Sequence, residues 1–177
     1  MKIEGKPYSP SDFASHAAGL VMGAWRPSQI VIHHCSAPSL AQRPKGFIPQ
    51  HMLNLKEYYE GKKWSAGPHM FTDDSRIWTF SPMTAPGVHA VSFNRTSIGI
   101  EMLGDYDAED PWSGRGLQVL TTTAKAVHAL LRKFQLDPAK AVRFHREDSK
   151  TTKTCPGIKI DKAAFMAFLH NQTPATP

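Results

Sequence analysis

Three short apolar segments of this chain each carry, or run directly into, a side chain that can bind a metal ion or move a proton. The segments are residues 30–32 followed by His33 and His34, residues 97–103 around Glu101, and residues 142–144 followed by His145. Short β-branched and apolar runs of this kind predict buried strands. A charged side chain inside such a strand is unusual, because charged groups are rarely buried without a partner. The sequence therefore predicts a sheet with chemically active residues at the ends of its strands.

Helical periodicity lies between and around the predicted strands. Amphipathic helices are predicted over residues 11–25, 48–60 and 117–134, and after a capping aspartate at residue 161. Residues 69–71 and 76–80 flank a polar turn and predict a β-hairpin. Alternation of strands and helices is typical of the α/β class, and no linker divides the chain, so we expect a single α/β domain.

Composition excludes several classes of protein and function. With 177 residues, of which 41% are hydrophobic, the chain can bury one domain's core. Its apolar runs are far shorter than the roughly 20 residues of a membrane span, and no apolar segment near Met1 indicates a secretory signal peptide. The formal net charge of +6 favours an anionic partner. The basic residues are scattered, however, without interleaved aromatic residues, so we expect no nucleic-acid partner.

The candidate site residues are sufficient in kind for a catalytic zinc centre. Such a centre needs three protein ligands of the histidine, cysteine or carboxylate type and one open position. The strand-end histidines and Glu101, together with Cys155 after a polar loop, can supply them. No HExxH or CxxC motif is present, however. From the residues alone, a hydrogen-bonded histidine pair, an inert buried thiol and a solvated glutamate remain alternatives.

Three motifs, taken together, resemble the signature segments of a known enzyme family. They are Ile30-Val31-Ile32-His33-His34-Cys35-Ser36-Ala37, then Thr96-Ser97-Ile98-Gly99-Ile100-Glu101-Met102, and last His145-Arg146-Glu147-Asp148 followed by Lys153-Thr154-Cys155-Pro156-Gly157. In this order they resemble zinc-dependent N-acetylmuramoyl-L-alanine amidases, the group that includes phage endolysin amidases and the peptidoglycan recognition proteins. The resemblance covers about residues 29–169. It implies a mixed central β-sheet flanked by helices.

The resemblance also implies a metal centre. The zinc ligands of the family are a histidine closing the first strand, a histidine before an arginine and acidic residues, and a cysteine just before Pro-Gly. These match His33, His145 and Cys155. The first match has an alternative, because counting from the strand favours His33, whereas counting back from Ser36 favours His34. Successive strand side chains face opposite ways, so we expect only one of the two to bind Zn²⁺. We expect it to be His33, because the apolar run ends there.

Further roles follow from the same resemblance. Glu101 matches a glutamate that some members use as general base, whereas other members use a tyrosine at a position that is Pro68 here. Lys153 matches a lysine that some members use to stabilise the oxyanion. His89 corresponds to a position that lines the substrate groove. The resemblance thus implies Glu101 and Lys153 as catalytic residues, and His89 with His34 as substrate-binding residues.

The expected function is a zinc hydrolase that cleaves the amide between N-acetylmuramic acid and L-alanine in peptidoglycan, in cell-wall lysis or turnover. Its partner is peptidoglycan or a muropeptide, and we expect a monomer. One alternative is a non-catalytic recognition module that binds peptidoglycan; members of this kind lack the metal-binding cysteine. Another is a cysteine hydrolase with Cys35 as nucleophile beside His33 or His34, although adjacency on a strand seldom places a base within reach of a thiol.

The predicted domain organisation has three parts. Residues 1–28 form an N-terminal helical extension packed on the domain, residues 29–170 form the amidase catalytic domain, and residues 171–177 form a frayed tail. Without a signal peptide, we expect the enzyme to be made in the cytoplasm. It would then reach the cell wall after release by another factor, or act in the cytoplasm on recycled muropeptides. Phage lysis, recycling and a toxin role all remain open.

Overall fold

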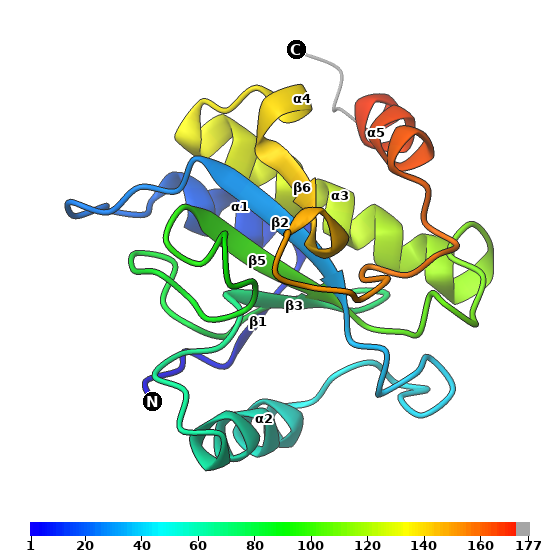
Figure 1. Ribbon diagram of the computed structural model, residues 1–177, viewed down its shortest axis with the longest axis horizontal. Coiled ribbons are helices and arrows are strands. Elements are labelled where there is room, and N and C mark those ends of the chain that lie inside the picture. Colours follow the sequence, from blue (N-terminus) through cyan, green and yellow to red (C-terminus); the bar gives the residue numbers. More distant parts are fainter. Residues whose placement is uncertain (173–177) are drawn as a thin grey trace.

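A six-stranded sheet, with its strands in the order β1-β4-β3-β5-β2-β6, organises the computed structural model, which describes residues 1–172. The strands are β1 (Lys6–Tyr8), β2 (Gln29–His34), β3 (Met70–Thr72), β4 (Ile77–Thr79), β5 (Ser97–Met102) and β6 (Val142–Phe144). β3, β5, β2 and β6 run parallel to one another, whereas β4 is antiparallel to both β3 and β1. This mixed sheet, with helices around it, confirms the expected fold class (Figure 1).

Helices cover the two faces of the sheet unequally. They are α1 (Pro10–Ala18), α2 (Pro49–Gly61), α3 (Gly114–Phe134), α4 (Pro138–Ala141) and α5 (Lys162–Asn171), with a 3-10 turn at His145–Glu147. Figure 1 shows α1 and α3 together behind the sheet, while α2 lies apart at the bottom of the view. A 2.7 Å hydrogen bond between Thr72 on β3 and Thr123 on α3 fixes that helix against its face of the sheet.

The strand register places His33 and Glu101 on the face of the sheet that α3 does not cover. His33 on β2 pairs with Glu101 on β5, which in turn pairs with Phe71 on β3, so these three side chains point the same way. Thr72, which contacts α3, points the opposite way. Ile32 lies on the same side as Thr72 and is fully buried. The sheet therefore buries its apolar alternates under α3 and leaves His33 and Glu101 on the other face.

Helix α1 is shorter than the sequence predicts. It begins after Ser9, whose side chain accepts a hydrogen bond from the backbone N–H of Asp12 in the first turn of the helix. It ends at Ala18 instead of near residue 25. Val21, which lies within the predicted amphipathic helix, is outside α1 and is 88% exposed. Glycines at positions 19 and 23 disfavour continued helix by about 1 kcal/mol each. Here the cost of these glycines outweighs the apolar periodicity that suggested a longer helix.

Two short elements are absent from the sequence-based expectation. β1 contains Pro7 and is only three residues long, so it carries no alternating pattern. α4 follows Asp137, whose side chain accepts a hydrogen bond from Ala139 N–H, and has Pro138 at its first position. An aspartate cap followed by proline is a recognised helix start, so this element had a readable signal. The hairpin of β3 and β4 and helices α2, α3 and α5 confirm the predictions for those segments.

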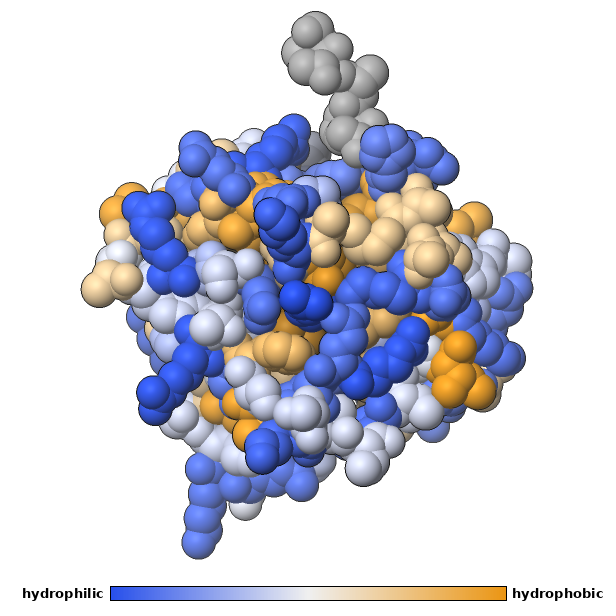
Figure 2. Space-filling view, turned by 45° about the horizontal axis from the view of Figure 1, so that its top comes forward, coloured by the Kyte–Doolittle hydropathy of each residue, from blue (hydrophilic) through white to orange (hydrophobic). Residues whose placement is uncertain are grey.

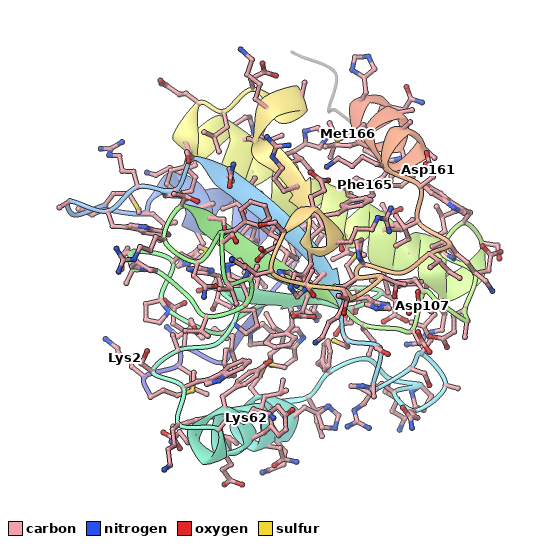
Figure 3. All side chains as sticks on the ribbon, viewed as in Figure 1. Lys2, Lys62, Asp107, Asp161, Phe165 and Met166 are labelled. Carbon is pink, nitrogen blue, oxygen red and sulfur yellow. The ribbon has the colours of Figure 1, made fainter. Side chains whose placement is uncertain are left out.

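The chain ends add to the domain in different ways. Residues 1–28 supply the edge strand β1 and helix α1, which packs on α3; the division at residue 29 stays a prediction. Of the predicted frayed tail, Asn171 closes α5, and residues 173–177 lie outside the described residues. Figure 3 shows Phe165 of α5 beside β6, where its ring lies 5.4 Å from that of Phe144.

Polar and charged side chains cover most of the face shown in Figure 2, where apolar residues form only small separate groups. Among the described helices, none combines the length and the apolar character needed to cross a membrane.

Candidate metal centre

His33, His145 and Cys155 come together at the carboxyl ends of β2 and β6. One donor atom from each lies within 4.8 Å of the other two, and the Nδ1 atoms of His33 and His145 are 3.1 Å apart. Two nitrogens bound to one tetrahedral zinc at about 2.0–2.1 Å would lie about 3.3 Å apart. His33 is 1% exposed and Cys155 is 5% exposed. The arrangement joins two imidazole nitrogens and a sulfur in a protected position.

His34 points away from this cluster. Its Nδ1 accepts a hydrogen bond from the backbone N–H of Tyr106 over 3.0 Å. Because an amide can only donate, Nδ1 carries no proton, so in the neutral ring Nε2 carries it. The lone pair of Nδ1 is thus occupied and that of Nε2 is absent. His34 also lies near Asp105 and Asp107, but neither of its ring nitrogens is free to hold a cation beside them.

The loop that carries Cys155 is attached to the segment that carries His145. Arg146 N–H donates to Cys155 O over 2.8 Å, and the Arg146 guanidinium donates to Thr154 O, Gly157 O and Ile160 O. Gly157 has a φ of +112°, and a Cβ there would lie 2.5 Å from the carbonyl carbon of Tyr106. Only glycine fits this position, so the Pro-Gly that follows Cys155 serves the shape of the loop.

The Cys155 sulfur has a defined environment. Its Sγ accepts a hydrogen bond from the backbone N–H of His34 at 3.4 Å. Burial is the largest effect and raises the pKa of the Cys155 thiol, with a further contribution from Glu101. A bound cation would reverse this effect, because coordination favours the thiolate. Two neutral nitrogens and one sulfur suit zinc better than magnesium or calcium, which prefer oxygen ligands.

The histidines of the cluster are suited to bind metal in their neutral form. Burial, followed by the proximity of His89 and His145, holds the pKa of His33 well below its usual value. Burial and Lys153 lower the pKa of His145, while Asp148 opposes the shift. A neutral imidazole keeps a lone pair available for coordination, so little proton release is needed from either ring.

Glu101 lies beside the donors without belonging to them. Its Oε1 is 3.7 Å from His33 Nδ1, and its side chain is 16% exposed. Burial raises the pKa of Glu101 to about 8, against a smaller lowering effect of Lys153. A carboxyl group with such a pKa can both accept and release a proton near neutral pH.

All seven residues singled out from the sequence line one cavity of about 720 Å³. Besides Glu101 and the three candidate metal ligands, these are His34, His89 and Lys153. The aromatic rings of Tyr59 and Trp64, which stack at 5.3 Å, form part of another wall. Figure 3 places Asp107, which also lines the cavity, on the loops beyond the strand ends. A cavity with apolar walls and a few convergent polar groups is typical of a small-molecule site.

Cys35 also lines the cavity, but its environment does not activate it. Burial, followed by the proximity of Glu101, raises its pKa well above the usual value. Among the described residues, neither His33 nor His34 hydrogen-bonds to its sulfur, and the backbone N–H of His34 donates to the sulfur of Cys155 instead. A protonated thiol without a base is a poor nucleophile, which disfavours the cysteine-hydrolase alternative.

Sequence reasoning missed several residues that shape this site. Arg146 was visible only as part of a motif, although its position next to a predicted donor was a signal. Tyr106 acts through its backbone amide, and a backbone contact leaves no trace in residue type. Ser97, at the start of β5, contacts His89, and no feature of the sequence indicates this contact.

This chain is similar to known proteins in sequence and in fold. Peptidoglycan-recognition protein LB of Drosophila melanogaster is 25% identical over 134 residues, which are 74% of this chain and 55% of the relative. The chain thus spans about half the length of that curated relative.

Solved structures share the fold. The endolysin amidase LysCS from Clostridium intestinale has a TM-score of 0.65 at 23% identity, covering 86% of this chain and 90% of that one. Drosophila PGRP-LB has a TM-score of 0.60 at 22% identity, covering 79% and 84%. The endolysin from a Thermus scotoductus bacteriophage has a TM-score of 0.62 at 19% identity, covering 88% and 90%.

The family assignment itself comes from the sequence. The family model for N-acetylmuramoyl-L-alanine amidase matches residues 24–158 of this chain. That segment includes all three donor residues, Glu101 and the cavity between them. The chain therefore belongs to the N-acetylmuramoyl-L-alanine amidase family.

Proposed function

We propose that this protein is a zinc-dependent N-acetylmuramoyl-L-alanine amidase that cleaves the amide between N-acetylmuramic acid and L-alanine in peptidoglycan or muropeptides. The observation that carries the proposal is the convergence of two imidazole nitrogens, a thiol and a carboxyl group of raised pKa in one cavity. Membership of the N-acetylmuramoyl-L-alanine amidase family is the reason for proposing this bond as the one that is cleaved. A Drosophila PGRP-LB mutant in complex with tracheal cytotoxin is among the similar structures.

His33, His145 and Cys155 would hold the zinc ion. Their donor types, mutual distances and burial fit a tetrahedral site that leaves one position for water or substrate. When bound, zinc supplies Lewis-acid chemistry: it lowers the pKa of a water molecule and polarises a carbonyl oxygen.

Glu101 would act as the general base and then as the general acid. It accepts a proton from the attacking water, whose oxygen forms the new bond to the amide carbonyl carbon. The carbon–nitrogen bond then breaks, and Glu101 returns the proton to the departing nitrogen of L-alanine. The products are the lactyl carboxyl group of the sugar and a stem peptide with a free amino terminus. A pKa of about 8 in the metal-free site suits a group that must do both.

Lys153 would stabilise the negative charge on the carbonyl oxygen. It lines the cavity two residues before Cys155, and it lowers the pKa of both Glu101 and His145 through its charge. A fixed cation at the point where an oxyanion develops contributes to transition-state stabilisation. His34 and His89 would contact the substrate from the cavity walls.

The net charge of +6 would help hold the protein on an anionic cell envelope, an attraction that salt weakens. We propose that the chain acts as a monomer on peptidoglycan.

The test is mass spectrometry of purified muropeptides after digestion, with and without a chelator. The proposal expects release of an intact stem peptide that begins with L-alanine, loss of release on chelation, and restoration by zinc. Cleavage between stem residues would instead make the protein a peptidase. Binding of muropeptides without any cleavage, in protein shown to contain zinc, would favour the recognition module.

A further inference from the structure

A chain of hydrogen bonds leads from the back of the His33 ring to a backbone carbonyl outside the metal centre. His33 Nε2 lies 3.0 Å from His89 Nδ1, and His89 Nε2 lies 3.3 Å from Ser97 Oγ. Ser97 Oγ in turn lies 2.7 Å from Phe93 O. Ser97 is fully buried. The other ring nitrogen of His33, Nδ1, faces His145 in the donor cluster.

The last link fixes the direction of every other link. A carbonyl oxygen can only accept, so the single hydroxyl proton of Ser97 is used on Phe93 O. The Ser97 oxygen must then accept from His89 Nε2–H, which leaves Nδ1 of a neutral His89 ring as an acceptor. His33 Nε2 must therefore donate to it. A neutral His33 with its proton on Nε2 presents the lone pair of Nδ1 toward His145 and Cys155.

Hydrogen bonds to its backbone and close packing of its ring fix the position of His89. The backbone N–H groups of His89 and Ala90 both donate to Asn94 Oδ1 at 2.8 Å. The ring lies over Gly99 of β5, where a Cβ would come within 2.5 Å of His89 Cγ. The His89 ring packs edge-on against the rings of His33 and His69 and hydrogen-bonds to no carboxylate among the described residues, so a positive charge on it would be buried without a partner, which favours the neutral form.

We propose that His89 and Ser97 are positioning residues that fix the tautomer and orientation of His33, so that Nδ1 is preset as the metal-binding atom. This inference deepens the proposed zinc site and rests on it for its purpose. It differs from the substrate contact expected for His89, because the ring acts through His33. Partners behind a ligating histidine commonly change metal affinity by about 10–100-fold when they are removed.

The first test measures the tautomer in metal-free protein. Protein labelled with ¹⁵N in its histidine rings is examined by long-range ¹H–¹⁵N NMR at pH 7.5. In the unaltered chain, His33 and His89 should both carry their proton on Nε2. His89→Leu removes the acceptor, and His33 should then populate both tautomers. His89→Gln restores an acceptor oxygen, so the Nε2–H tautomer of His33 should return.

The second test measures zinc affinity by competition with a chelator. Ser97→Ala and His89→Leu should weaken zinc binding by about 10–100-fold, and His89→Gln should recover much of the loss. Ser81→Ala is the matched control, because Ser81 is 1% exposed and its hydroxyl also makes two hydrogen bonds, both to Gly67. Zinc affinity in this variant should stay unchanged.

The outcomes separate this inference from the proposed function. A His33 proton on Nδ1 in the unaltered metal-free protein would overturn the inference, as would equal tautomer populations in His89→Leu and His89→Gln. Equal loss of zinc affinity in Ser97→Ala and Ser81→Ala would also overturn it, since that pattern reflects a general packing effect. If the tautomer and affinity results hold while muropeptides stay uncleaved, the proposed amidase activity fails and the positioning role stands.

Discussion

His33 and Glu101 are register partners on neighbouring parallel strands, and this pairing places a ring nitrogen of His33 and a carboxylate oxygen of Glu101 3.7 Å apart. The two residues are 68 positions apart in the chain, so only the β2–β5 pairing brings them together. Both strands are buried and paired on each side. The relative position of the two groups is therefore set by the backbone hydrogen bonds of the sheet, which are among the most rigid features of a fold.

Replacing Glu101 by glutamine should remove catalysis and leave zinc binding intact. Glutamine keeps the size of the side chain but cannot take up or return a proton. We expect kcat to fall by about 10²–10⁴-fold, the range typical of a lost general base. Muropeptide turnover measures the loss, and metal analysis of the same sample provides the control. A variant that keeps full turnover would rule out Glu101 as the proton carrier.

Metal-free protein should lose stability between about pH 5 and pH 8 through Glu101. An unfolded glutamate titrates near 4.3, whereas Glu101 in the fold titrates at about 8. Between these values the folded state binds the extra proton, so its stability falls as pH rises. Above pH 8 the loss is complete.

Urea denaturation of the metal-free protein and of Glu101→Gln at several pH values checks this sign. As pH rises, the unfolding free energy of the unaltered protein should fall relative to that of Glu101→Gln, by an amount on the order of a few kcal/mol. Comparing the two proteins at each pH cancels the opposing contribution of His33, whose lowered pKa favours the fold as pH rises toward 6.5. A constant difference across this range would contradict the raised pKa of Glu101.

The two cysteines should respond differently to alanine substitution. Cys155→Ala removes one of three donors, so we expect loss of stoichiometric zinc and of activity. Cys35→Ala should keep both, because that thiol is not a donor and is held protonated by burial. Zinc content and muropeptide turnover of the two variants, side by side, make the comparison. Loss of activity with zinc retained in Cys35→Ala would revive the cysteine-hydrolase alternative.

Removing zinc should lower the melting temperature of the unaltered protein. A ligand that binds only the folded state stabilises it by about 4 kcal/mol at a free concentration of 1,000 Kd. Thermal unfolding with EDTA, and then with zinc restored, measures this difference. Cys155→Ala should show no such shift, which separates specific binding from a general effect of the chelator.

Gly157→Ala should destabilise the loop that carries Cys155. The residue has a φ of +112°, and the added Cβ would lie 2.5 Å from the backbone of Tyr106. We expect a loss of about 2 kcal/mol or more in unfolding free energy, together with weaker zinc binding.

Gly61→Ala offers a matched control for this substitution. Nothing lies within 4 Å of a Cβ at Gly61, which closes α2 without a positive φ. The change should be neutral or stabilising by up to about 1 kcal/mol. Equal effects of the two substitutions would mean that the Cys155 loop does not depend on glycine.

Much of the candidate site could be predicted because its residues lie at the ends of strands with clear patterns. The apolar run before His33 and the alternation around Glu101 are local signals, and parallel strands bring their carboxyl ends to one edge. The family resemblance then indicated which residues to propose as metal ligands. Helix α1 shows the limit of periodicity, since its apolar pattern continued past the glycine where the helix ends.

The choice between His33 and His34 could not be made from the sequence alone. It depends on partners that are distant in the chain: His145 lies 112 residues from His33, and Tyr106 lies 72 residues from His34. The same holds for His89, whose link to His33 spans 56 residues. Contacts of this kind become visible only once the sheet and its loops have been placed.

The backbone amide of Tyr106 determines which of two adjacent histidines is available to a metal ion. Consecutive residues of β2, His33 and His34, carry imidazoles on opposite faces of the strand, and each ring lies near other groups that can bind a metal ion. The N–H group of Tyr106 occupies the lone pair of His34 Nδ1, so it prevents that ring from competing for the ion without adding a charge or a bulky side chain. The preference for His33 over His34 as the metal ligand thus depends on a backbone N–H group in a neighbouring loop. Substituting the side chain of Tyr106 would leave that N–H group in place.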